Sequence, residues 1–370
     1  MTRTITQKTT ESRRSSPLRA SATIKDVAAR AHVSVATVSR VLNQTGLVQK
    51  ETSLRVSRAI HALQYVPHAV ARSLSIRRTN TIGVLLPDLY GEFFSEVIRG
   101  IDVAARRHGY HLLVSGSHSD SNEMNAMLSA VRGHVDGLIV MSPELDGANL
   151  CSRLRTTQPV VLLNCMPKTG SAITIDNEGG ARSMVEHLAS LGHRWIAFIK
   201  GPDNNADAAE RLRGFRAASA RIHGVADVRL EFDGDFSESA GYEAARHIMA
   251  LDPRPTAVFA ANDAMAIGAL CAFRELGIQV PEDLAVTGFD DIPIARYVTP
   301  PLTTVSVAIA ELGRRAFELL LEAVDERGDS DGRREILPTT LVVRQSCGAA
   351  LAAKQRQQRR KPLQKSHVTF

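Results

Sequence analysis

The sequence predicts a small all-α head followed by an α/β core of two doubly wound parallel-sheet subdomains. Three observations lead to this expectation. Residues 23–63 hold short segments of helical periodicity, and from Thr81 onward β-branched apolar runs alternate with amphipathic segments. The formal charge is +11 over residues 1–80 and −11 over residues 81–349. A basic head on an acidic body indicates a polyanionic partner, most simply nucleic acid, although a solubilising tail would give the same charge.

The composition is that of a soluble protein with two or three domains. The chain has 370 residues, of which 44% are hydrophobic and 23% charged. No apolar run reaches the roughly 18–20 residues that cross a bilayer. The first 22 residues lack the hydrophobic centre of a secretory signal, and the four cysteines form no CxxC pair or zinc spacing. We therefore expect a cytoplasmic protein with reduced thiols and no membrane partner.

The head is predicted over residues 23–66, after a disordered basic arm at residues 1–22. In its first helix, TIKDVAARA, Thr23 is the expected N-cap and Asp26 completes a capping box. Its third helix, KETSLRVSRAIHALQY, carries apolar residues near helical spacing, namely Leu54, Val56, Ile60 and Leu63.

The second helix of the head, SVATVSRVLN, has an unusual exposed side. Ser34 is its expected cap, and Val38, Val41 and Leu42 form its buried stripe. A solvated helix face usually carries Glu and Lys, but this one has no carboxylate: it carries Val35, Ala36, Ser39, Arg40 and Asn43. Small side chains let the backbone approach DNA base edges, and an Arg pairing with guanine contributes about 1–3 kcal/mol of discrimination. The alternative is an ordinary surface helix.

The core is predicted from nine apolar strand-like runs. These are TIGVLLPD, HLLVSGS, VDGLIVMSP, PVVLLNC, AITIDN, WIAFIKGP, VRLEFDG, AVFAAND and LAVTGFDD. One further helix is expected between VDGLIVMSP and PVVLLNC, and the others at about Phe94–Gly109, Asn122–Gly133, Gly179–Leu191, Ala209–Ile222, Ser239–Leu251 and Ala264–Leu276. Nine strands exceed one sheet comfortably, so two facing subdomains are expected, with ligands bound in the cleft beyond the carboxyl ends of the strands.

With these residues considered, the chain resembles the lactose-repressor (LacI/GalR) family of bacterial transcription regulators. The resemblance runs from Thr23 to Arg344 and rests on TIKDVAARAHVSVATVSRVLN, YVPHAVARSL, IGVLLPD, LGHRWIAFIKGP, AANDAMAIGAL and VTGFDD. It implies a helix-turn-helix head, a hinge helix and linker at 67–80, and a periplasmic-binding-protein-like core at 81–349. The expected N-subdomain covers about 81–176 and 305–334, the C-subdomain about 177–304 and 335–349, and a disordered basic tail follows at 350–370.

The resemblance assigns DNA-contacting roles in the head. Val35, Ala36 and Arg40 would read base edges in the major groove. The phosphate contacts would come from Thr23, Ser34, Thr37, Ser39 and Asn43, although Ser39 could equally be a simple helix residue. This chain has His32 at a turn position that is usually Gly and Gln49 where a Ser cap is usual.

The resemblance also assigns a role to the hinge. Leu74 would insert into the minor groove beside its copy from a second chain, while Ala71 is small enough for two hinge helices to pack closely. The alternative for Leu74 is local packing against the core. His68 replaces the usual Asn after Pro67 and could contact phosphate. A helix this short is marginal alone, so it would be ordered only when two chains hold it on DNA.

A ligand site is expected where the core strands end. Tyr90, Phe93, Phe94 and Phe236 supply aromatic surface, and Asn164, Arg211, Asn262 and Asp290 supply hydrogen bonds to hydroxyls. Asn205 and Asp207 lie on a loop that the family uses for effector contacts. The alternatives are a structural Arg211–Asp290 ion pair, a strand-end cap at Asn262, a core position for Phe94 and ordinary turn chemistry in the Asn205–Asp207 loop. Asp291 is expected to hold its own loop.

These observations predict a homodimeric transcriptional regulator, expected to be a repressor. It would bind a palindromic operator in double-stranded DNA, under allosteric control by a sugar or related effector. The alternative is a non-catalytic sugar-binding receptor. We expect no catalytic residues, no cofactor and no metal, because the sequence lacks a GxGxxG motif after a strand, a Walker loop and a GxSxG motif.

Overall fold

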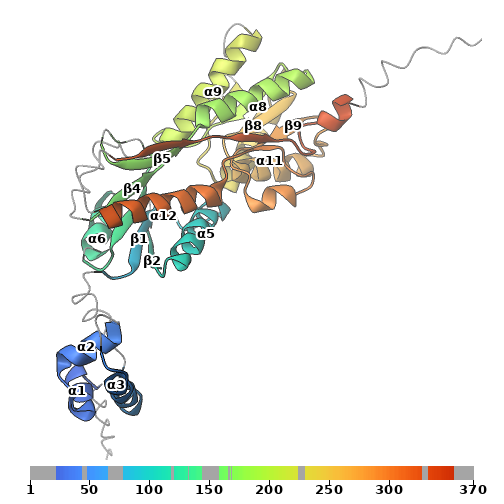
Figure 1. Cartoon of the computed structure of the whole chain (residues 1–370). Helices are drawn as coiled ribbons and strands as arrows, with labels where there is room; N and C mark the ends of the chain where they lie inside the picture. Colours follow the sequence, from blue (N-terminus) through green and yellow to red (C-terminus); the bar gives the residue numbers. More distant parts are fainter. Residues whose placement is uncertain are drawn as a thin grey trace, which may run out of the picture. The chain divides into compact units, whose positions relative to one another are not determined.

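The computed structural model describes residues 22–43, 48–65, 78–117, 121–131, 133–143, 158–165, 167, 169–223, 230–326 and 332–353. The chain divides after Thr79 into two compact units, the head and the core (Figure 1). The following predictions lie outside the described residues: the roles of His68, Ala71 and Leu74, the helix expected between VDGLIVMSP and PVVLLNC, and most of the arm and tail. No helix in the described part of the chain is both long and apolar enough to span a membrane.

The head contains three helices around a small apolar core. They are α1 (Ile24–Ala31), α2 (Val35–Asn43) and α3 (Lys50–Leu63). Their buried side chains are Val27, Ala28, Ala31, Val38, Val56, Ala59 and Tyr65. The expected stripe of α3 was wrong at one position, because Leu54 is 55% exposed and the small Ala59 is buried instead. A head of this size leaves little room for bulky side chains where helices cross.

The predicted caps of the head are confirmed. Thr23 and Asp26 form a capping box, in which the backbone N–H of Thr23 donates to Asp26 Oδ2 over 2.8 Å. The Ser34 hydroxyl accepts a hydrogen bond from the backbone N–H of Thr37 over 3.1 Å. His32 ends α1 in the left-handed conformation, with φ of 52°, and Gln49 makes no side-chain cap hydrogen bond at the start of α3. These caps fix the turn that leads into α2.

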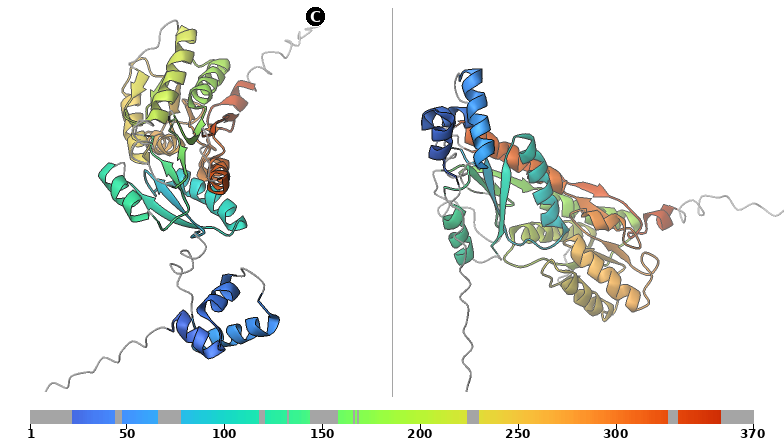
Figure 2. Two further views of the ribbon diagram at one scale, coloured as in Figure 1. Left: turned by 60° about the vertical axis from the view of Figure 1, so that its left-hand side comes forward. Right: turned by 90° about the horizontal axis from the view of Figure 1, so that it is seen from below.

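The first lobe of the core contains a six-stranded parallel sheet in the order β11-β5-β4-β3-β1-β2. Its strands are β1 (Thr81–Leu86), β2 (His111–Gly116), β3 (Gly137–Met141), β4 (Val160–Leu163), β5 (Ser171–Ile175) and β11 (Arg334–Leu337). Helices α5 (Glu92–Arg107) and α12 (Ile309–Glu326) cover one face, and α6 (Ser121–Val131) covers the other (Figure 2). Alternate residues of β1 serve the two faces: Val84 packs in the cluster with α5, and Leu85 in the cluster with α6.

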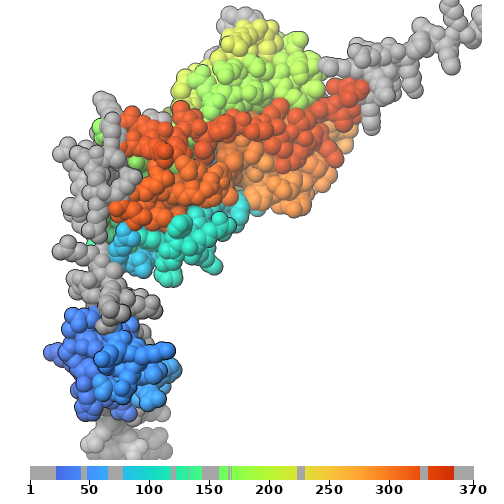
Figure 3. Space-filling model, viewed as in Figure 1, coloured from blue at the N-terminus to red at the C-terminus, as the bar shows by residue number. Residues whose placement is uncertain are grey.

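Helices α5 and α12 pack side by side at the surface of this lobe (Figure 3). Their close approach depends on glycine. A Cβ added at Gly100 of α5 would meet the backbone oxygen of Ala310 at 2.0 Å, and one at Gly313 of α12 would meet the oxygen of Val97 at 2.3 Å. Glycine at both positions therefore allows the two helix backbones to touch.

The second lobe is a four-stranded parallel sheet in the order β7-β6-β8-β9. Its strands are β6 (Ile196–Ile199), β7 (Glu231–Phe232), β8 (Ala257–Ala260) and β9 (Ala285–Thr287). Its helices pack in two pairs, α8 (Asn177–Leu191) with α9 (Ala206–His223), and α10 (Glu238–Met249) with α11 (Asp263–Glu275). Phe198 on the sheet stacks on Phe215 of α9 with ring centroids 4.6 Å apart.

The chain crosses between the lobes more than once. It leaves the first sheet after β5 and returns through β10 (Thr304–Ser306) into α12. It leaves again after β11 for β12 (Thr340–Val342), which pairs antiparallel with β10. The expected boundary assigned residues 335–349 to the second lobe, whereas Glu335–Leu337 lie in β11 and pair with β5 of the first sheet.

Several core helices begin one to three residues before their expected starts. Helix α9 begins at Ala206 rather than Ala209, and α11 at Asp263 rather than Ala264. The reason is capping. The Asn205 Oδ1 accepts from the backbone N–H of Ala208, and the Asn262 Oδ1 accepts from that of Met265, so each helix begins directly after its Asn.

Candidate functional site

The exposed face of α2 has the properties expected of a DNA-reading surface. Val35 is 41% exposed, Ala36 and Arg40 are also exposed, and Thr37 and Ser39 are half-buried. Asn43 is the last residue of the helix. The first turn of α2 has no acidic residue, so the positive end of its helix dipole is not neutralised by its own side chains.

The head as a whole is basic around this face. Its described residues up to Tyr65 include six Lys or Arg but only two carboxylates, Asp26 and Glu51. The Asp26 carboxylate is held by Thr23, and these hydrogen bonds keep its pKa below the usual value. Glu51 lies in the first turn of α3, not on α2. An anionic duplex can therefore approach α2 without meeting a carboxylate on that helix.

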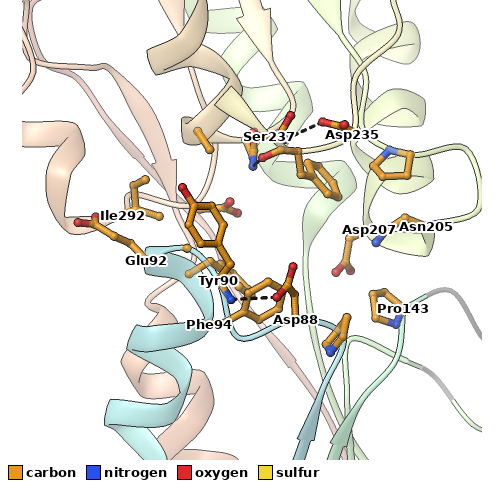
Figure 4. Close-up of a pocket in the computed structure, with 18 of the residues that line it drawn as sticks. Asp88, Tyr90, Glu92, Phe94, Pro143, Asn205, Asp207, Asp235, Ser237 and Ile292 are labelled. Carbon is orange, nitrogen blue, oxygen red and sulfur yellow. Dashed lines mark hydrogen bonds between the residues drawn. The ribbon is translucent and has the colours of Figure 1, made fainter. Parts of the chain in front are cut away.

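A cleft of about 760 Å³ opens between the two lobes of the core (Figure 4). It lies at the carboxyl ends of strands from both sheets, since Asn164 follows β4, Asn262 follows β8 and Asp290 follows β9. All ten side chains predicted for the ligand site line it: Tyr90, Phe93, Phe94, Asn164, Asn205, Asp207, Arg211, Phe236, Asn262 and Asp290. The structure thus brings together residues that lie up to 200 positions apart, as parallel-sheet topology predicts.

Arg211 is the central charge at the floor of the cleft. It is 3% exposed, and its Nη2 lies 3.0 Å from Asp290 Oδ1. Its Nε donates to Asn177 Oδ1 over 2.8 Å and its Nη1 to the backbone oxygen of Ala261 over 2.6 Å. The guanidinium also lies 4.0 Å from the centre of the Phe289 ring. The structural ion pair considered as an alternative is therefore present, and both of its members also line the cleft.

Asp207 is the second buried carboxylate of the cleft. Its Oδ2 accepts from Asn164 Nδ2 over 2.7 Å, and its Oδ1 from Asn177 Nδ2 over 2.8 Å. Burial raises the pKa of Asp207 to about 6, against the opposing effect of the Arg211 charge. Burial likewise raises the pKa of Asp290 to about 6, again opposed by Arg211. The guanidinium therefore helps both carboxyl groups to ionise.

Several hydrogen bonds join the lobes across the cleft. Asn164 belongs to the first lobe and Asp207 to the second, so their hydrogen bond crosses the cleft. At the mouth, Glu92 Oε2 accepts from the backbone N–H of Ile294 over 2.8 Å. The backbone N–H of Ala206 donates to the oxygen of Pro143 over 3.0 Å. A change in the angle between the lobes would have to break these bonds.

The cleft residues also have local structural roles. Asn262 caps α11, and its Nδ2 donates to the backbone oxygen of Phe236 over 2.9 Å, so the capping alternative holds. Asn205 makes the turn chemistry that its loop suggested. Phe94 is half-buried and meets Phe93 edge-on at 5.6 Å, whereas Tyr90 is 74% exposed at the rim.

Sequence reasoning missed two buried polar residues behind the cleft. Asn177 is fully buried and links Arg211 to Asp207. Asp263 is also fully buried, with its Oδ2 accepting from the backbone N–H of Ile292 over 2.9 Å, and burial raises its pKa well above the usual value. Each is the first residue of a helix and lies within three residues of the end of a strand, and that position was the available signal. As expected, Asp291 holds its own loop, through Arg344 at 2.6 Å.

The head is basic and helical, and its helix α2 carries no carboxylate. The core that follows has two α/β lobes with a cleft between them. This combination is typical of bacterial transcription regulators. Comparisons with known proteins support this class. Residues 23–68 match the family "Bacterial regulatory proteins, lacI family", and residues 185–347 match "Periplasmic binding protein-like domain". The chain is 36% identical over 337 residues to the HTH-type transcriptional repressor PurR of Haemophilus influenzae (strain PittEE), covering 89% of this chain and 100% of that protein.

Further relatives agree. The ribose operon repressor of Escherichia coli (strain K12) is 36% identical over 322 residues, covering 86% of this chain and 97% of the relative. A structure of the lac repressor dimer bound to operator and the anti-inducer ONPF matches with a TM-score of 0.79 and 31% identity, covering 88% of this chain and 99% of that chain. A transcriptional regulator CelR–cellobiose complex matches with a TM-score of 0.66, 32% identity and the same coverage. The chain belongs to the lacI family of bacterial regulatory proteins. Its relatives are transcriptional repressors, not enzymes.

Proposed function

We propose that this protein is a cytoplasmic repressor that binds a palindromic operator as a homodimer and is controlled by a small hydroxylated effector in the cleft. The observation that carries the DNA-binding part is the exposed face of α2. It presents Val35, Ala36 and Arg40 without a carboxylate. Arg40 is the side chain on this face that can donate two hydrogen bonds to guanine.

The dimer follows from the size of the head. A single α2 reads only a few base pairs, and two such helices related by a two-fold axis read an inverted repeat. Support comes from the lac repressor, whose dimer is bound to operator in the matching structure. His68, Ala71 and Leu74 remain predicted hinge contacts.

The effector part is carried by the hydrogen bonds that cross the cleft. A ligand contacting both Asn164 and Asp207 would compete with, or reinforce, the bond between them. Either effect changes the relative stability of lobe arrangements, and DNA affinity changes with it if the heads sense those arrangements. The aromatic and polar lining suits a sugar or sugar derivative, and a cellobiose complex is among the matching structures.

The test is DNA binding by the full chain. An operator would be selected from random duplexes and its affinity measured by fluorescence anisotropy beside a scrambled duplex. Arg40→Ala should lose most of the preference for the operator but keep weak, salt-sensitive binding to both duplexes. Arg58→Ala removes the same charge from an exposed site on α3 and is the matched control. Equal losses on both duplexes with Arg40→Ala would refute its role as a base reader.

A further inference from the structure

Most of the charged side chains that line the cleft are acidic. Of the described residues that line it, six carry carboxylates and one, Arg211, is basic. The carboxylates are Asp88, Glu92, Asp207, Asp235, Glu238 and Asp290. They come from both lobes, and Figure 4 shows Asp88, Asp207 and Asp235 on different sides of the same opening. A ligand in the cleft therefore meets negative charge from several directions.

The one basic side chain is already engaged. Arg211 is paired with Asp290 and donates to Asn177 and to the backbone oxygen of Ala261. Recognition of a phosphate or carboxylate usually takes a guanidinium or ammonium that can turn its donors to the anion. An anion could reach only the N–H groups of Arg211 that these three contacts leave over, beside the buried Asp290 carboxylate, whose charge repels it.

A buried acceptor at the floor of the cleft is also without a partner. Asn164 is 3% exposed, and its Nδ2 is committed to Asp207. Its Oδ1 accepts no hydrogen bond from the described residues. This oxygen has almost no accessible surface, so a ligand reaches it only if neighbouring side chains move. A donor brought to it would then offset the roughly 1–3 kcal/mol that an unpaired buried acceptor costs. A hydroxyl or an ammonium group can donate, whereas an ionised carboxylate cannot.

We propose that the cleft selects an uncharged or cationic, hydroxyl-bearing effector and rejects phosphorylated and carboxylated metabolites. This inference rests on the proposed function, because it specifies the ligand of the same cleft. The rim carboxylates Asp88, Asp235 and Glu238 are exposed, so salt screens their effect. Asp207 and Asp290 are buried, so discrimination at the floor persists at higher salt.

The test compares sugars that differ only in charge. Isothermal titration of the full chain would use D-glucose, glucosamine, gluconate and glucose 6-phosphate, together with D-ribose and ribose 5-phosphate, at low and moderate salt. At least one uncharged sugar or the amine should bind, and its anionic counterpart should bind at least about tenfold more weakly, with the gap narrowing as salt rises. An anionic sugar that binds as tightly as its uncharged counterpart would overturn the proposal. So would a panel in which no member binds.

Rim variants separate charge from shape. The double variant Asp235→Asn and Glu238→Gln removes two exposed carboxylates at the start of α10 and keeps similar side-chain volumes. It should raise affinity for the phosphorylated sugar severalfold relative to affinity for the uncharged sugar. Glu243→Gln, on an exposed site of α10 that does not line the cleft, is the matched control and should change neither. Discrimination unaltered by the double variant would contradict the electrostatic account.

An operator-binding assay with the same protein distinguishes failure of the charge-selectivity proposal from failure of the proposed function. If the protein binds the selected operator but anionic sugars bind the cleft more tightly than uncharged ones, the proposed charge selectivity is refuted and the proposed DNA-binding function is not. If no operator is bound with specificity, the proposed function falls, whatever the titrations show.

Discussion

Replacing Arg211 with alanine should destabilise the core in a pH-dependent way. Arg211 lies between two buried carboxylates, and its charge lowers the pKa of each. Even with this help, the pKa values of Asp207 and Asp290 are about 6, against 3.8 for an ordinary Asp. A shift of about two units corresponds to about 3 kcal/mol for each ionised carboxylate at neutral pH. Without Arg211 both pKa values should rise further.

The sign of the effect follows from proton binding. A carboxyl group whose pKa is raised in the folded state binds more protons folded than unfolded, so the free energy of unfolding falls as pH rises from about 4 through the folded pKa. In the native chain the contribution of Asp207 and Asp290 to this fall should end near pH 6. In Arg211→Ala it should continue above pH 6. At pH 8 the free energy of unfolding of the variant should be about 3–5 kcal/mol lower than that of the native chain, which is the cost of removing one partner of a buried ion pair. At pH 5 the difference should be smaller.

Urea denaturation can measure this difference in the free energy of unfolding. The chain has a single tryptophan, Trp195, directly before β6 of the same lobe, which serves as a fluorescent reporter. Arg213→Ala is the matched control, because Arg213 lies on the same helix but its side chain is 56% exposed in pairs with Glu178 and Glu210. It should change stability by less than about 1 kcal/mol. A loss in Arg211→Ala that is equal at pH 5 and pH 8 would refute the charge argument and leave only lost packing on Phe289.

Three further outcomes are expected. Arg40→Ala should lower the preference for operator over scrambled DNA by about 1–3 kcal/mol per half-site, measured by anisotropy; a preference equal to that of Arg58→Ala would contradict this. His32→Gly should stabilise the head by up to about 1 kcal/mol in thermal melts, because His32 sits at φ of 52°, where glycine is unstrained; a lower melting temperature would mean that the imidazole makes a contact worth more. Gly100→Ala should destabilise the core, since its Cβ would meet the Ala310 oxygen at 2.0 Å; unchanged denaturation would show that α5 and α12 can separate freely.

Much of the fold could be predicted because local signals agreed with the tertiary structure. The caps at Thr23 and Ser34 act within three residues, so the sequence contains both partners of each hydrogen bond. The apolar runs from Thr81 onward became parallel strands because their residues are buried on both faces of each sheet. The starts of α9 and α11 were less predictable, since Asn205 and Asn262 serve as caps and cleft residues at once.

The sequence predicted which residues line the cleft, but it did not predict the hydrogen bonds between them. Positions at strand ends indicated Asn164 and Asp290, and parallel topology gathers such positions at one edge. That Asn177 bridges Arg211 and Asp207 depends on how α8 and α9 pack, and no periodicity encodes that contact. Strand β11 could not be predicted either, because a short strand with alternating burial resembles a linker.

The central claim is that α2 reads an operator under the control of the cleft. Footprinting of the full chain on selected DNA tests it most directly, with and without a sugar that binds by titration. We expect a protected inverted repeat whose occupancy changes when that sugar is added. Protection without two-fold symmetry, or a symmetric footprint that no cleft-binding sugar alters, would contradict it.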